Sequence, residues 1–174
     1  YSKKFKRIGT TVFAAYNMGT PYDPANIGLT AIPKFKRYTM NPKFFIYFND
    51  KTRLNIGFNS TTEDRIGGDI KYIEGKGDNI HSYFEKNKTT RFSTQSGFDH
   101  IINNKSKLAI KNSVSYYDRI IEIPSYRFSG IQLSSFSEVS YNHNGEKSEW
   151  ISGLNLLSDQ FNQNSIDTLI EGDY

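Results

Sequence analysis

The stretch RLNIGFNSTTEDR, residues 53–65, decides the fold class. Its odd-numbered positions, from Arg53 to Arg65, carry charged, amide or hydroxyl side chains or glycine, whereas its even-numbered positions begin with Leu54, Ile56 and Phe58. Side chains of an extended chain point alternately to the two faces of a sheet, so this period of two predicts a strand with one apolar and one charged face.

The same alternation recurs along the chain and predicts six further strands. They cover residues 5–16, 42–48, 91–102, 107–120, 130–142 and 149–159. No segment shows a helical period as clear as this period of two, and no shift in composition marks a domain boundary. We therefore expect one all-β domain built as an antiparallel meander of about seven long strands.

The connections between these strands alternate in length. Short turns are predicted at residues 49–51, 103–106 and 143–147, whereas long connections are predicted at residues 17–33 and 67–85, with a shorter one at 124–130. Tight turns at one end and long loops at the other are typical of transmembrane β-barrels, in which the outer loops carry much of the function. The meander is thus predicted to be part of a large transmembrane β-barrel.

Several features predict that residues 1–174 form a partial barrel. Seven strands leave two open edges, which lipid cannot satisfy with hydrogen bonds. The basic segment at residues 3–7 is not followed by the apolar run of a signal peptide, and no plug domain is visible. The end of the chain, residues 167–174, is expected to be a further loop. A passive porin of eight strands is an alternative, and it needs an eighth strand within residues 162–174.

Some phrases of the sequence resemble the barrels of TonB-dependent outer-membrane receptors, in particular those of Bacteroidota. They include FAAYN at 13–17, GTPYDP at 19–24, EDRIGG at 63–68 and YIEG at 72–75. The resemblance implies a barrel of about 22 strands with a plugged lumen. It also implies active uptake of a scarce ligand, such as a ferric siderophore, haem, cobalamin or a glycan.

The partners that this resemblance implies follow from the location in the bacterial outer membrane. They are outer-membrane lipid and lipopolysaccharide, the remaining strands and plug of the receptor, the TonB complex through that plug, and a small molecule or metal chelate as ligand. No cofactor and no nucleic-acid partner is expected.

Two sets of residues are candidates for function. Polar residues of the charged strand faces are expected to line the lumen: Arg53, Asn59, Glu63, Arg91, Gln95, Lys111 and Arg119. Aromatic and polar residues of the predicted outer loops are expected to contact ligand, because stiff aromatic rings give large contact area at low entropic cost: Tyr22, Asp23, Tyr72, His81, Tyr83, Tyr126 and Arg127.

The sequence gives little support for catalysis or metal binding. The chain has no cysteine, and its three histidines are too far apart for a local metal motif. Glu63 and Asp64 are neighbours on a strand and so point to opposite faces, which excludes a facing acid–base pair. We therefore expect no catalytic residue and no metal site. A secreted β-sandwich that binds glycans is the second alternative, since two packed sheets would also alternate.

The basic phrase KFKR occurs at residues 4–7 and again at 34–37. Nucleic-acid binding by charge and stacking is one interpretation, and strand ends at a membrane boundary are the favoured one. On the second interpretation, Lys34, Lys36 and Arg37 lie at the outer rim and contact lipopolysaccharide phosphates.

Overall fold

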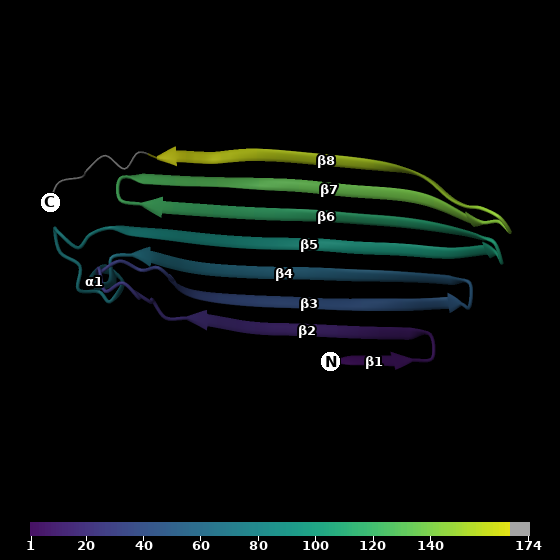
Figure 1. Cartoon of the computed structure of the whole chain (residues 1–174), viewed down its shortest axis with the longest axis horizontal. Coiled ribbons are helices and arrows are strands. Elements are labelled where there is room, and N and C mark those ends of the chain that lie inside the picture. The colour runs from purple at the N-terminus through teal and green to yellow at the C-terminus, as the bar shows by residue number, and fades with distance from the viewer. Residues whose placement is uncertain (168–174) are drawn as a thin grey trace.

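The computed structural model describes residues 1–167, and these form one open sheet of eight antiparallel strands arranged in chain order (Figure 1). The predicted all-β antiparallel meander is confirmed. The strands and the single short helix are β1 (Ser2–Phe5), β2 (Ile8–Gly19), β3 (Lys34–Asn49), β4 (Thr52–Gly68), α1 (Ile70–Ile73), β5 (Phe84–Asn103), β6 (Ser106–Ile123), β7 (Tyr126–Asn144) and β8 (Glu149–Asp167). No helix within the described residues is long and apolar enough to cross a membrane.

The prediction of about seven strands is wrong by one, at the N-terminus. Residues 5–16 were expected to be a single strand, but β1 and β2 form a hairpin in which Phe5 pairs with Ile8. The turn between them is Lys6-Arg7, which has none of the glycine, asparagine or proline that marks turns in a sequence. The passive-porin alternative needs an eighth strand within residues 162–174, and residues 162–167 of this range are the end of β8. Residues 168–174, where the final loop was expected, lie outside the described residues.

The two ends of the sheet differ as the sequence predicts. At the end that we call the turn end, β3–β4 and β5–β6 are joined by two-residue turns, and in each the asparagine before the turn accepts a hydrogen bond from a backbone N–H. The distances are 2.9 Å from Lys51 N to Asn49 Oδ1 and 2.9 Å from Lys105 N to Asn103 Oδ1. At the other end, the loop end, residues 20–33 and 69–83 form the long connections around α1 (Figure 1).

The connection predicted at residues 124–130 is shorter than expected. β6 ends at Ile123 and β7 begins at Tyr126, so only Pro124 and Ser125 form the turn, with Ser125 at φ 66°. Tyr126 and Arg127 therefore begin a strand and are not loop residues, which corrects their placement among the loop candidates. Pro124 signals a turn, but the sequence alone does not show where the next strand starts.

The pairing register separates the side chains into two faces, because residues directly opposite on neighbouring strands share a face. On the apolar face, one continuous row crosses six strands: Ile46, Leu54, Phe98, Ile110, Val139 and Leu154. On the polar face, a corresponding row is Lys43, Gly57, Gln95, Ser113 and Phe136. The two-faced strands read from the sequence are confirmed.

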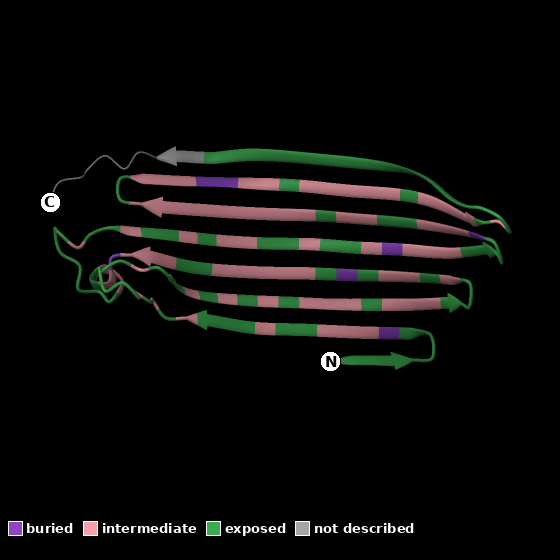
Figure 2. Cartoon of the chain, in the orientation of Figure 1, coloured by how far each residue is buried: buried purple, intermediate pink, exposed green. Residues whose placement is uncertain are grey.

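Among the described residues, no hydrophobic side chain is buried. The described strands pair with their neighbours in chain order. Large apolar groups of the apolar face remain open, such as Leu154 with 83% of its surface exposed. Figure 2 shows the strands as mostly intermediate or exposed, with β8 exposed along its coloured length. The sheet thus presents a broad apolar surface. For the sheet to be stable, this surface must be covered by lipid or by another layer of protein.

Candidate functional site

Arginine side chains gather on the polar face near the loop end. Arg37 of β3 pairs with Glu63 of β4, Glu63 with Thr89 of β5, and Thr89 with Arg119 of β6. Neighbouring strands are about 4.8 Å apart, so this row brings distant parts of the sequence close together. With residues of adjacent rows it lines an open hollow of about 510 Å³, which we call the arginine hollow: Arg37, Thr39, Asn59, Thr61, Glu63, Arg65, Asn87, Thr89, Arg91, Tyr117 and Arg119.

Glu63 holds two of these arginines. One carboxylate oxygen accepts from Arg37, and the other lies 2.9 Å from Nη2 of Arg65. The Glu63 side chain is only 13% exposed, whereas both arginines are 41% exposed. The Phe35 ring lies beside both guanidinium groups, at 5.7 Å from Arg37 and 6.0 Å from Arg65. A carboxylate shared by two cations, with an aromatic ring beside them, fixes the guanidinium groups in place.

The other two arginines have neutral partners. The guanidinium of Arg91 lies 4.7 Å from the centre of the Tyr117 ring, and Nε of Arg119 donates to Oδ1 of Asn87 at 3.4 Å. The ion pairs of the described residues include neither Arg91 nor Arg119. The hollow therefore contains four guanidinium groups and a single carboxylate. Its chemistry suits a ligand with carboxylate, phosphate or other anionic oxygens, which guanidinium groups bind in a bidentate manner.

Two carboxylates on the same face, between its middle and the turn end, hold cations in ion pairs. Asp99 lies 2.7 Å from both Arg53 and Lys107, and Lys111 lies 2.8 Å from Glu138. The turn end itself is also rich in positive charge, because the hollow there is lined by six cations and two carboxylates: Lys4, Lys6, Arg7, Lys51, Arg53 and Lys107, with Asp50 and Asp99. The arginine hollow differs from it in kind, since all four of its cations are guanidinium groups.

The register places all seven predicted lumen-lining residues on the polar face. Asn59, Glu63, Arg91 and Arg119 come together in the arginine hollow, whereas Arg53, Gln95 and Lys111 lie nearer the turn end. The lumen itself remains a prediction.

Sequence reasoning missed Arg37 and Tyr117 as members of this cluster, because cross-strand neighbours are known only once the register is known. It also placed Arg37 on one rim with Lys34 and Lys36. The structure corrects this, since Arg37 alternates to the polar face and binds Glu63.

The predicted loop contacts are mostly engaged in holding the loops together. Tyr22 forms a bridge with Ile32, Oδ2 of Asp23 accepts from Gly28 N at 2.7 Å, and the Tyr72 ring stacks on Phe84 at 4.7 Å. The two long loops also join each other, since Thr30 N donates to Gly68 O and Ile70 N to Gly28 O, each at 2.9 Å. Tyr83, with a half-exposed side chain, accepts a backbone hydrogen bond from Asp69. These residues build a folded cap beside the hollow.

Two predicted loop contacts, Tyr126 and Arg127, separate to opposite faces of the sheet. Tyr126 lies on the polar face opposite Ile123, and Arg127 lies on the apolar face opposite Glu122, with Nε 3.3 Å from its carboxylate. Of the two, only Tyr126 shares a face with the arginine hollow. Their contact with a ligand stays a prediction.

His81 is bound within its own loop by Asp78. The Asp78 carboxylate accepts from the backbone N–H groups of His81 and Ile80 at 2.8 Å and lies 2.9 Å from Nδ1 of His81. The backbone hydrogen bond from His81, followed by its side chain and the Ile80 N–H, lowers the pKa of Asp78 to about 2. The other two histidines lie near the turn end on the apolar face, where His100 contacts Thr52 and His143 contacts Ser106. The described residues contain no group of three side chains suited to hold a metal.

No protein family, curated protein or solved structure with which the chain was compared matches it.

Proposed function

We propose that this chain is a wall segment of a large outer-membrane β-barrel, a TonB-dependent receptor for active uptake of a scarce ligand. The ligand classes are a ferric siderophore, haem, cobalamin or a glycan. The observation that carries the proposal is the two-faced sheet without a buried hydrophobic side chain among its described residues. In a barrel, lipid covers the apolar face and the polar face borders a hydrated interior.

Strand length supports a membrane wall. β3 to β8 have 16 to 20 residues each. About 9–11 residues of a tilted strand cross the hydrocarbon layer, so these strands would extend beyond it, as the long strands of large barrels do. Strands of soluble sheets most often have about 5–6 residues. The short turns at one end and the folded loops at the other agree with the two sides of such a membrane.

The arginine hollow supports a receptor in particular. It lies on the proposed interior face, beside the interlocked long loops, where an incoming ligand would first meet the wall. Its four guanidinium groups favour the anionic members of the ligand classes. The chain supplies positioning and charge on this proposal, and no catalytic residue.

The alternatives rest on fewer observations. A soluble β-sandwich that binds glycans would cover the apolar face with a second sheet, and the hydroxyl groups on that face, such as Ser60, Thr94 and Ser135, are compatible with it. A passive porin of eight strands would need β1 to pair with β8. In the described residues these strands are opposite edges of one open sheet.

The test uses the full-length gene product that contains residues 1–174, expressed in a bacterial outer membrane. We expect it to fractionate with that membrane and to migrate faster on a denaturing gel before boiling than after, as closed barrels do. We further expect TonB-dependent uptake of one member of a panel of radio-iron chelates, haem, cobalamin and a soluble glycan. A soluble product would contradict the proposal, and uptake that does not require TonB would favour the porin.

A further inference from the structure

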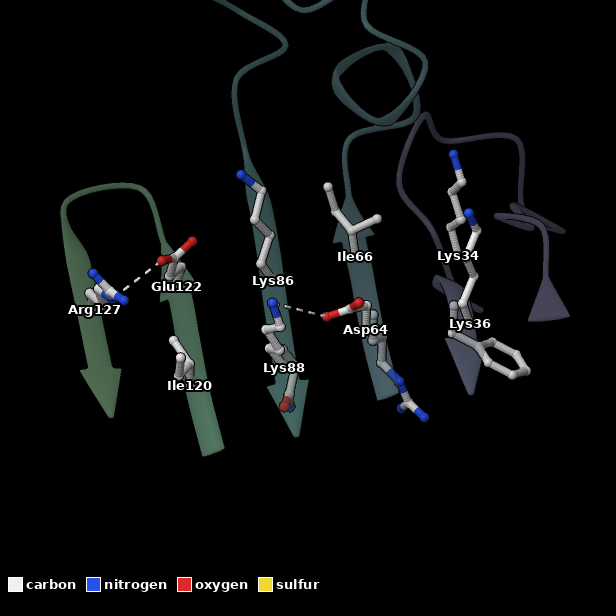
Figure 3. Close-up of a pocket in the computed structure, with 12 residues that line it drawn as sticks. Lys34, Lys36, Asp64, Ile66, Lys86, Lys88, Ile120, Glu122 and Arg127 are labelled. Carbon is white, nitrogen blue, oxygen red and sulfur yellow. Dashed lines mark ion pairs between the residues drawn. The ribbon is translucent and has the colours of Figure 1, made fainter. Parts of the chain in front are cut away.

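A second cluster of positive charge lies at the loop end of the apolar face. Its residues follow two rows of the pairing register, Lys34–Ile66–Lys86–Glu122–Arg127 and Lys36–Asp64–Lys88–Ile120. They lie on the neighbouring strands from β3 to β7, beside the loops (Figure 3). The side chains line an open hollow of about 550 Å³, and we call the cluster the lysine rim: Lys34, Lys36, Lys86, Lys88 and Arg127, with Asp64 and Glu122.

The positive charge of the lysine rim is only partly balanced. The cluster has five cations and two carboxylates, and Arg65 of the other face also borders the hollow. Lys88 lies 3.9 Å from Asp64, at the limit of an ion pair, and Arg127 lies 3.3 Å from Glu122. Nζ of Lys86 lies 4.7 Å from the centre of the Phe84 ring, and the ion pairs of the described residues include neither Lys34 nor Lys36. An anion placed in the hollow would meet several ammonium groups at once.

The lysine rim continues directly into the apolar face. The next residues toward the middle of the sheet include Tyr38, which packs on Tyr16 with ring centres 4.7 Å apart, and Met40, both about half exposed. Beyond them, Phe92 lies between Phe58 and Tyr116 at ring distances of 6.0 and 6.4 Å. A ligand that fits this surface has an anionic head at the rim and apolar chains along the strands. Free phosphate would use only the first of these features.

The opposite end of the same face has different chemistry. There, His100 and His143 are each 2.9 Å from a hydroxyl, of Thr52 and Ser106, and Trp150 packs against Tyr141 and His143. Neutral hydrogen-bonded and aromatic groups suit an ordinary membrane boundary. On this face, the described cluster of ammonium groups therefore lies at the loop end.

We propose that the lysine rim binds the phosphate groups of a phosphorylated lipid in the leaflet around the loop end. The inference rests on the proposed function, because it requires the apolar face to meet lipid. Lysine ammonium groups are flexible point charges with three donors each, which suits headgroup phosphates in several positions. Arg37 takes no part, since it lies on the other face.

The experiment compares two variants of the full-length protein with equal loss of charge. In one, Lys34, Lys36, Lys86 and Lys88 are replaced by Gln. In the matched control, Lys4, Lys6, Lys51 and Lys105, near or in the turns at the opposite end, are replaced by Gln. Binding of diphosphorylated lipid A is titrated by native mass spectrometry in a neutral detergent, with dephosphorylated lipid A and inorganic phosphate as further probes.

We expect the rim variant to bind lipid A at least about 10-fold more weakly than the wild type, because each basic residue near a phosphate surface contributes appreciably. The control variant should bind it as the wild type does, dephosphorylated lipid A should bind weakly to all three proteins, and inorganic phosphate should not compete at equal concentration. Equal lipid A binding by the rim variant and the wild type would overturn the proposal, as would full competition by inorganic phosphate.

Failure of the lipid site and failure of the barrel are distinguishable. A protein that remains in the membrane and keeps its heat-dependent gel shift, but binds lipid A independently of these lysines, contradicts the lipid site alone. A protein that is soluble and lacks the gel shift contradicts the barrel and the lipid site together.

Discussion

The arginine hollow and the lysine rim occupy the same end of the sheet but opposite faces. The hollow positions guanidinium groups by a half-buried carboxylate, an aromatic ring and an amide, through Glu63, Tyr117 and Asn87. The rim holds four ammonium groups on flexible stems, of which only Lys88 has an ion pair among the described residues, with Asp64 at 3.9 Å. Fixed forks of donors suit one anionic ligand in a defined pose, whereas mobile point charges suit many similar headgroups.

The difference arises from single steps along the chain. Lys36 and Arg37 are neighbours, as are Glu63 and Asp64, yet in each pair one residue belongs to the rim and the other to the hollow. Alternation in a strand separates the two residues of each pair, although Arg65 and Asn87 border both hollows. A few residues at a strand end can therefore serve two surfaces with independent chemistry, and substitutions in one cluster should leave the other unaffected.

The largest effect on ligand affinity is expected from reversal of charge in the arginine hollow. In the variant with Arg91→Glu and Arg119→Glu, we expect the affinity for the ligand identified in the uptake panel to fall by about 100-fold or more, since two charged hydrogen bonds of about 1.5–3 kcal/mol each are lost. Equilibrium binding to cells that carry the full-length receptor measures it.

The control for this prediction is the same reversal on the other face, Lys86→Glu with Lys88→Glu. It should leave ligand affinity unchanged within about twofold, because charges on the far side of the wall are screened over about 8–10 Å. Equal losses in both variants would show that net charge alone acts and that the hollow has no specific role.

A second prediction concerns the junction between β4 and its loop. Gly68 has φ 114°, and a Cβ added there would lie 2.5 Å from the carbonyl oxygen of Tyr83. Gly68→Ala should lower the free energy of unfolding by about 1–3 kcal/mol, since an L side chain is strained in this conformation and the neighbouring backbone must shift. Unfolding in urea from lipid vesicles measures the change.

Gly28→Ala is the matched comparison, because Gly28 has φ 82° but no atom within 4 Å of the added Cβ. It should destabilise by about 1 kcal/mol, through conformational strain alone. We expect Gly68→Ala to weaken ligand binding as well, since the interlocked loops lie beside the hollow, and to leave lipid A binding at the rim intact. Equal stability of the two variants would contradict the clash.

Smaller effects on stability are expected from substitution of the two adjacent carboxylates, Glu63 and Asp64. Glu63→Gln leaves Arg37 and Arg65 without their shared partner and should destabilise by about 1 kcal/mol. Asp64→Asn removes one exposed contact at 3.9 Å, and it should change stability by only about 0.2 kcal/mol. Urea unfolding midpoints of the two variants test this, and a larger effect of Asp64→Asn would reverse our ranking of the hollow as the more ordered cluster.

The sequence predicted the strands and their faces well, because period-two alternation and asparagine turns are local signals. It placed Leu54 and Ile56 on one apolar face, and the register pairs them with the apolar residues Ile46 and Phe44 of β3. It missed β1, whose four residues and unmarked Lys6-Arg7 turn leave too little pattern. It extended the connection after Pro124, because a proline marks a turn without fixing its length.

The clusters were harder to predict than the strands. Glu63, Arg91 and Arg119 were recognised as residues of one face, but their meeting with Arg37 depends on cross-strand register. The lysine rim has the same origin, since Lys86 and Lys88 come from β5 and Lys34 and Lys36 from β3. Loop residues such as Tyr72 and Asp23 were proposed as ligand contacts, and the structure uses them within the cap, where contacts are not periodic and give no local signal.

The smallest predicted effect concerns the Asp78 carboxylate of the long loop. Unlike the charges of the two clusters, it is bound by residues of its own turn. Asp78 accepts three hydrogen bonds from Ile80 and His81, and they lower its pKa from 3.8 to about 2. A depressed pKa in the folded loop means that the stabilisation is fully present above pH 3.8 and is lost as the pH falls toward 2.

Titration of the labelled aspartate carboxyl carbon by NMR, with the Asp78 signal identified from Asp78→Asn, should give a midpoint of about 2. His81→Ala should raise that midpoint only in part, because the backbone N–H groups still donate. A midpoint at 3.8 in the unsubstituted protein would show that the turn is not formed in solution, and the loop cap would then be less ordered than either cluster of the sheet.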